Sequence, residues 1–309
     1  MIRYALLRLA QGVPVLLVVA TVTFVLLRFL PGGPFDTEKA LPPEVLRNIE
    51  ARYALDAPLL TQYGHYLAGL ARGDLGPSYK YTGRDVAAIL RDAIPVSMLL
   101  GGVALLLAVA VGIPIGLAAG TRRGSAADRT LQVVALFGLS VPSFVLGAAL
   151  ILVFGLALGW LPAALWEGPL YVILPAVTLA ALPATYVAQL TRTSVIEVMD
   201  LDYVRTARAK GLPESLVRRR HVLRNALLAV VTYFGPLLAV LLTGSFVVEQ
   251  IFAVPGMGRF FVTAVTNRDY PLVLGVTLVY AALVVLSNLA VDLLYAWLDP
   301  RLRPEAGAP

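Results

Sequence analysis

Residues that could carry out chemistry are few in this chain. It contains no cysteine and only two histidines, His65 and His221. Thiolate metal sites, iron–sulfur clusters and cysteine nucleophiles are therefore excluded. Its lysines are Lys39, Lys80 and Lys210, none of which follows a glycine, so the chain has no Gly-x-x-x-x-Gly-Lys-Ser/Thr loop of a P-loop ATPase. The motifs of zinc peptidases and serine hydrolases are also missing, and we expect no catalytic residue, metal site or cofactor here.

The most basic part of the chain is the segment 192–225, in which eight basic residues accompany four acidic ones. Gly211 and Pro213 divide it, because glycine permits a left-handed C-cap and proline starts a helix well. We therefore expect two short helices joined by a tight turn. An apolar face on this segment would consist of Tyr203, Val204, Ala207, Leu212, Leu216, Val217 and Leu223.

The composition indicates that these residues are carried on membrane-spanning elements. Of the 309 residues, 59% are hydrophobic and 14% are charged, and the apolar residues fall in long unbroken runs. The net charge of +6 is explained by the positive-inside rule and by contact with anionic lipid, without nucleic acid as a partner. We therefore expect an all-α polytopic membrane protein.

Six apolar segments are long enough to be membrane-spanning helices. The first lies between Arg8 and Arg28, and the uncharged stretch between them would extend about 28 Å as a helix. It ends without a small-x-small cleavage site, so we interpret it as a span and not as a signal peptide. Pro142 should kink the third span. The other five are expected at about 95–119, 131–158, 170–190, 226–248 and 272–298.

Charge asymmetry predicts the orientation of these spans. The fourth segment is polar for a span, but if it crosses the membrane, the basic loop 121–129 and segment 192–225 lie on the same side as the N-terminus. This arrangement follows the positive-inside rule and makes both termini cytoplasmic. The chain would then consist of residues 1–30 with the first helix, an extracytoplasmic helical region at 31–94, and a five-helix core at 95–309.

Two carboxylates near the ends of spans could take part in transport. Asp292 lies inside the sixth expected span, where a carboxylate can relay protons. Its position about a turn and a half from the cytoplasmic end favours instead an ion pair with a basic group. Glu249 follows the fifth span, and we interpret it first as an interface residue and second as a substrate contact. His65 lies on an expected amphipathic helix, where a structural or solvated role is favoured.

Segment 192–225 has three possible interpretations. It could be a solvated positive-inside loop, a patch for anionic lipid served by Arg218, Arg219 and Arg220, or a docking element for a soluble partner. We favour the docking element, because a purely solvated loop does not need an apolar face.

Two stretches of this segment carry a family resemblance. Residues 202–212 (Asp-Tyr-Val-Arg-Thr-Ala-Arg-Ala-Lys-Gly-Leu) and 221–227 (His-Val-Leu-Arg-Asn-Ala-Leu) resemble the "EAA" coupling loop of the permease subunits of bacterial ABC importers, in the form of the dipeptide/oligopeptide (and nickel/glutathione) branch. Ala207, Gly211 and Leu223 match the general pattern of that loop. Further stretches that resemble this branch lie at 55–63, 73–78, 142–144, 249–258, 267–271 and 294–301.

The resemblance implies a type I ABC importer permease fold with six transmembrane helices in the bacterial inner membrane. It also implies a second homologous permease, two ABC ATPase subunits that bind ATP and Mg²⁺, and an extracytoplasmic substrate-binding protein. Dipeptides, oligopeptides, nickel and glutathione all remain open as substrates. The coupling loop would seat in a groove of the ATPase through Tyr203, Arg205, Ala207, Arg208, Lys210, Gly211, Leu212 and Leu223.

Two other classes of protein are the alternatives. One is an ATP-independent carrier with Asp292 as its proton site, and the other is an intramembrane enzyme or a lipid-bound scaffold. Neither explains the pattern of segment 192–225.

Overall fold

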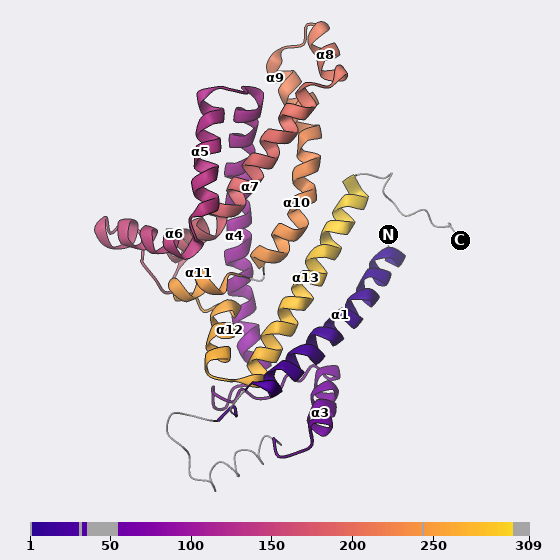
Figure 1. Cartoon of the computed structure of the whole chain (residues 1–309), viewed down its shortest axis with the longest axis vertical. Helices are drawn as coiled ribbons and strands as arrows, with labels where there is room; N and C mark the ends of the chain where they lie inside the picture. The colour runs from indigo at the N-terminus through magenta and orange to yellow at the C-terminus, as the bar shows by residue number, and fades with distance from the viewer. Residues whose placement is uncertain (1, 31–32, 36–54, 243, 299–309) are drawn as a thin grey trace.

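The computed structural model describes residues 2–30, 33–35, 55–242 and 244–298, and these are almost entirely helical. Long helices run side by side, and the short helices lie at both ends and along one side of the molecule (Figure 1). The α-helices are α1 (Ile2–Phe29), α3 (Leu59–Ala71), α4 (Val86–Thr121), α5 (Ala126–Ser140), α6 (Ser143–Leu150), α7 (Ile173–Met199), α8 (Asp202–Ala209), α9 (Glu214–Leu216), α10 (Arg224–Leu242), α11 (Phe246–Ile251), α12 (Met257–Thr266) and α13 (Tyr270–Leu298). Two π-helical segments, η1 (Ile151–Ala157) and η3 (Val217–Leu223), and a 3₁₀ helix, η2 (Pro169–Val172), connect them.

Four helices within the described residues are long and apolar enough to cross a membrane. They cover Ala5–Phe29, Val86–Thr121, Pro169–Met199 and Tyr270–Leu293. These four correspond to the first, second, fourth and sixth spans expected from the sequence. The fourth is longer than expected, because α7 continues without a break to Met199 and so includes the beginning of segment 192–225.

The regions of the third and fifth expected spans are broken into shorter helices. In place of one kinked helix over 131–158, α5 ends at Ser140 and α6 leaves its end at a wide angle (Figure 1). The extended backbone of Pro142, which has no amide hydrogen to donate, separates the two helices. Similarly, α10 ends at Leu242, short of the expected limit at Val248, and Ser245 caps the separate helix α11.

The contact between α4 and α7 is made through their backbones. Three glycines, spaced four residues apart, lie on the face of α4 that touches α7. A Cβ at any of them would stand less than 3.0 Å from a backbone carbonyl oxygen of α7, so no other residue fits without a shift. Small residues allow such close packing of membrane helices. The three pairs are Gly112 with Ala184, Gly116 with Ala188, and Gly120 with Arg192.

A buried ion pair joins α5 to α7. The side chain of Asp128 is only 2% exposed, and both of its oxygens accept hydrogen bonds from Arg192, from Nε and from Nη2 at 3.1 Å. The amide of Gly124 donates a further bond of 2.8 Å to Asp128. The pair therefore holds the short connection between α4 and α5 against the last turns of α7.

A second ion pair joins α1 to α13. Arg8 Nε lies 3.2 Å from Asp292 Oδ2, and both side chains are partly exposed. The expectation that Asp292 has a basic partner near the end of its helix is confirmed.

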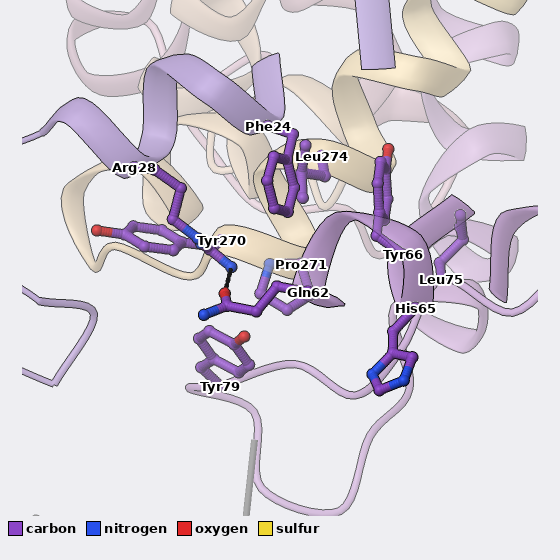
Figure 2. Close-up of a pocket in the computed structure, with 10 residues that line it drawn as sticks. All are labelled: Phe24, Arg28, Gln62, His65, Tyr66, Leu75, Tyr79, Tyr270, Pro271 and Leu274. Carbon is purple, nitrogen blue, oxygen red and sulfur yellow. Dashed lines mark hydrogen bonds between the residues drawn. The ribbon is translucent and has the colours of Figure 1, made fainter. Parts of the chain in front are cut away.

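At the opposite end of α1, Arg28 is held between helices α1, α3 and α13. Its guanidinium stacks over the rings of Phe24 and Tyr270, at 4.7 and 5.3 Å from their centroids, and Nη2 donates to Gln62 Oε1 at 2.6 Å. Figure 2 shows these groups around a cavity of about 140 Å³. His65 lies at its rim with an exposed side chain, as expected for a solvated histidine. The cluster ties α3 to the long helices α1 and α13.

We predict that Gly116→Ala destabilises the chain by about 1–3 kcal/mol, because the added methyl group would clash with the carbonyl of Ala188. The measurement is the unfolding temperature of the purified protein in detergent. Gly102→Ala is the matched control on the same helix, since a Cβ there meets no atom within 4 Å. It should be neutral or stabilising by up to about 1 kcal/mol. Equal loss in both variants would contradict backbone packing of α4 on α7.

We also predict that Arg192→Met destabilises the chain by about 3–5 kcal/mol, because it leaves the carboxylate of Asp128 buried without its partner. The double variant Asp128→Asn, Arg192→Met should recover part of this loss, since no buried charge remains. Arg8→Met, which breaks a partly exposed pair, should cost about 0–1 kcal/mol. Thermal unfolding measures all three variants, and a double variant less stable than Arg192→Met would refute this explanation.

Candidate coupling site

Segment 203–224 is a compact helix–turn–helix at one end of the molecule (Figure 1). Helix α8 ends at Ala209, and Gly211 adopts a φ of 75°, which confirms the predicted glycine turn. Pro213 then stands at the N-cap of α9, in extended conformation, as the sequence predicts. The π-helical η3 joins α9 directly to α10. The segment is thus fixed at both ends to long helices, α7 and α10.

The apolar face of this segment is turned partly inward. Three of its residues, Val204, Ala207 and Val217, are at most 5% exposed and form a small core with Val222, one residue of α7 and one of α10, whereas Tyr203 and Leu216 stay exposed. The buried part of this face is therefore not available to a partner, because the segment needs these side chains for its own folding. Ala207, one of the expected ATPase contacts, packs in this core. The six core residues are Val195, Val204, Ala207, Val217, Val222 and Ala226, with Leu212 packed against them.

Polar bonds close the segment on itself. Arg208 makes two hydrogen bonds across the turn to Glu214, at 3.0 and 3.2 Å, and these bonds lower the pKa of the Glu214 carboxyl below its usual value. The amide of Asn225 donates to the hydroxyl of Tyr203 at 2.7 Å and to the carbonyl of His221 at 3.0 Å. These bonds connect the beginning of α8 to the beginning of α10.

The outward surface of the segment is cationic. Arg205 has 68% of its side chain exposed and lies 3.6 Å from the exposed Asp202. Lys210 and Gly211 are exposed at the tip, whereas Leu223 is half-buried in η3. Of the expected contact residues, Tyr203, Arg205, Arg208, Lys210 and Gly211 are exposed, whereas Ala207 is buried and Leu212 and Leu223 are half-buried.

Sequence reasoning missed the partners that make the segment rigid. Glu214 and Asn225 were not singled out, although an acid just after the Gly-Leu-Pro turn is well placed to pair with an arginine before it. Asp128, the only acid in the basic loop 121–129, was not singled out either. Its isolation among three arginines was the available signal, because a lone acid there is placed to form an ion pair.

Glu249 differs from the interface residue, and from the substrate contact, that the sequence suggested. Its side chain is 0% exposed, so it faces neither water nor lipid. It accepts hydrogen bonds from Ser97 Oγ at 2.8 Å and from the amide of Gly258 at 2.7 Å. The amide of Arg259 donates a third bond of 3.2 Å. Its oxygens are therefore occupied in joining α11 and α12 to α4, and they are not free for a substrate.

Metal ligands do not converge in the part of the chain that the structure describes. No group of three or more histidine, aspartate or glutamate side chains lies close enough there to hold an ion.

Two family models match this chain along most of its length. The model described as "Binding-protein-dependent transport system inner membrane component" matches residues 112–304. The model of the N-terminal part of the same membrane component matches residues 1–100.

Curated relatives are similar over nearly the entire chain. The oligopeptide transport system permease protein OppB of Haemophilus influenzae is 44% identical over 305 residues, which are 98% of this chain and 100% of that protein. The dipeptide transport system permease protein DppB of Bacillus subtilis is 42% identical over 303 residues, or 98% of both chains.

A solved structure shares the fold at lower identity. A chain of the MetNI methionine ABC transporter, solved in inward-facing conformations, superposes with a TM-score of 0.54 at 19% identity, and the match covers 68% of this chain and 96% of that one. The resemblance inferred from segment 192–225 is thus confirmed, and the chain belongs to the family of inner membrane components of binding-protein-dependent transport systems.

Proposed function

We propose that this chain is the permease subunit of an ATP-driven importer and forms half of a translocation pathway for dipeptides or oligopeptides. The observation that carries the proposal is the similarity to peptide permeases over 98% of the chain, coupling segment included. The protein is a transport subunit of the inner membrane and not an enzyme, and ATP hydrolysis takes place in partner subunits.

The proposed topology has six crossings with both termini in the cytoplasm. Figure 1 supports it, because the N-terminal end of α1 and the C-terminal end of α13 are directed toward the end that holds α8 and α9. Helices α5 with α6, and α10, would supply the third and fifth crossings. Residues 31–94 would then form the extracytoplasmic region, between the first helix in 1–30 and the five-helix core in 95–309.

The proposed complex contains a second, homologous permease and two ABC ATPase subunits that bind ATP and Mg²⁺. An extracytoplasmic binding protein delivers the substrate, and membrane lipid surrounds the helices. The exposed cations Arg205 and Lys210 are suited to contact a groove on the ATPase, and Gly211 provides the turn between them and α9. Ala207 and Leu212 pack in the core beneath that surface, and the exposed Tyr203 and Arg208 hold it in shape through their hydrogen bonds. Leu223 lies half-buried in η3.

Transport would follow from alternating access. Closure of the ATPases on ATP draws the two coupling segments together, and hydrolysis releases them. Because α8 continues from α7 with only Asp200 and Leu201 between them, a displacement of the segment moves α7 and the helices packed on it. The pathway would thereby open alternately to the binding protein and to the cytoplasm.

Asp292 is poorly placed to be the proton site of an ATP-independent carrier, the alternative raised by the sequence. Asp292 is already paired with Arg8 near the end of α13 and is not placed in mid-membrane.

We predict that Gly211→Val uncouples ATP hydrolysis from transport, because a β-branched residue is strained at a φ of 75° and would distort the turn. Peptide uptake by the reconstituted complex should fall by roughly tenfold or more, as expected for about 1–3 kcal/mol of backbone strain at the docking surface. Uptake and ATP hydrolysis are measured in the same proteoliposomes at equal protein content.

Gly83→Val is the matched control. Gly83 has a φ of 78° with open space around it, so the substitution imposes similar strain far from the coupling segment. It should leave uptake near the wild-type level. Wild-type uptake by Gly211→Val, at equal abundance in the membrane, would overturn the assigned role of the turn.

A further inference from the structure

A pocket of about 330 Å³ lies between α7 and α10, away from the coupling segment. Tyr186 and Tyr233 place their rings 6.1 Å apart at a tilt of 43° on one side of it. Gln189, Leu190 and Thr193 complete the lining. All but one of these residues belong to α7, which is among the helices able to cross a membrane.

The polar groups of this pocket have no partner among the described residues. Tyr186, Gln189, Thr193 and Tyr233 form no hydrogen bond there, although each carries a hydroxyl or an amide. Several threonine hydroxyls in the long helices instead donate to the carbonyl four residues earlier in their own helix. Examples are Thr178 to Leu174, Thr185 to Ala181, Thr191 to Val187 and Thr232 to Leu228.

Lipid is an unsuitable neighbour for such a surface. Polar groups without hydrogen bonds are costly in hydrocarbon, and this cost excludes a lipid-facing position for a glutamine and two phenols. No residue of α4 lines the pocket. Tyr186, Gln189 and Thr193 follow one another at helical spacing on one face of α7, whereas the carbonyls that meet the glycines of α4 define another face. This surface is therefore suited to contact with water or a polar solute.

The chemistry of the lining fits a peptide. A glutamine amide has both a donor and acceptors, as a peptide bond does, and phenol rings pack on side chains of many kinds. None of the lining residues carries a charge, so the pocket would favour neither acidic nor basic side chains.

We propose that this pocket binds the transported peptide during its passage, with Gln189 bonding the peptide backbone and the two tyrosines receiving its side chains. The inference rests on the proposed function, and it adds the site and the mode of recognition. Because the pocket lies on α7, it moves with the coupling segment and releases the peptide when α7 shifts.

The test uses the complete complex, reconstituted in nanodiscs with its ATPases, second permease and binding protein. This chain has no cysteine, so Gln189→Cys introduces its only thiol. A charged, water-soluble thiol reagent should label it, and mass spectrometry of this chain excludes any signal from partner subunits. Saturating peptide during ATP turnover should slow the labelling by roughly tenfold, as expected for occupancy of most sites. Leu106→Cys, 69% exposed in the apolar middle of α4, is the control and should stay unlabelled.

Uptake provides the second measurement. Gln189→Leu should lower peptide uptake by roughly fivefold, the effect of losing an uncharged hydrogen bond, while hydrolysis stimulated by the binding protein continues. Thr232→Val, whose hydroxyl bonds within α10, should leave uptake unchanged.

A thiol at position 189 that is unlabelled, or labelled at the same rate with and without peptide, would overturn the pocket assignment. Either result leaves the importer function standing if the complex still couples hydrolysis to uptake. Failure of the wild-type complex to show hydrolysis that depends on the binding protein would instead refute the proposed function.

Discussion

The packing of α4 on α7 is the constraint on which the other parts depend. Three glycines of α4 meet three carbonyls of α7, so the two backbones touch over several turns and neither helix can rotate or slide without a clash. The end of α7 leads into the coupling segment, and its middle carries the pocket with Gln189. A rigid α7 therefore connects the surface that would meet the ATPase to the surface that would meet the solute.

The coupling segment shares this rigidity because it is folded independently of any partner. Its small core, the Arg208–Glu214 bonds across the turn and the Asn225 bonds to Tyr203 fix its shape before docking. The Asp128–Arg192 pair adds a brace between α5 and the last turns of α7. A partner that binds the outward cations thus meets a preformed surface, and little binding free energy is lost in ordering it.

The sequence predicts features that depend on local conformation. Gly211 and Pro213 allowed the turn to be placed correctly, and long apolar runs located α1, α4, α7 and α13. Whether a side chain is buried depends instead on which other helices pack over it, and the spacing of apolar residues in the sequence does not reveal this. An apolar face on the coupling segment was visible, but its burial against α7 and α10 was not.

The same limit explains the errors made for Glu249 and Pro142. Glu249 was read as an interface residue because it follows an apolar run, and only the fold shows the amides of Gly258 and Arg259 that enclose it. Likewise, Pro142 predicts a disturbance, but whether a helix kinks or ends there is decided by packing around it.

Identification of the proteins that copurify with this chain tests the proposed importer function most directly. The tagged chain would be purified from its native membrane in mild detergent, and its stoichiometric partners identified by mass spectrometry. We expect P-loop ATPase subunits and a second multi-span permease in the wild-type sample, and loss of the ATPase subunits alone when the surface of segment 203–224 is disrupted. Recovery of a solitary chain that still drives uptake from an ion gradient without ATP would contradict the account.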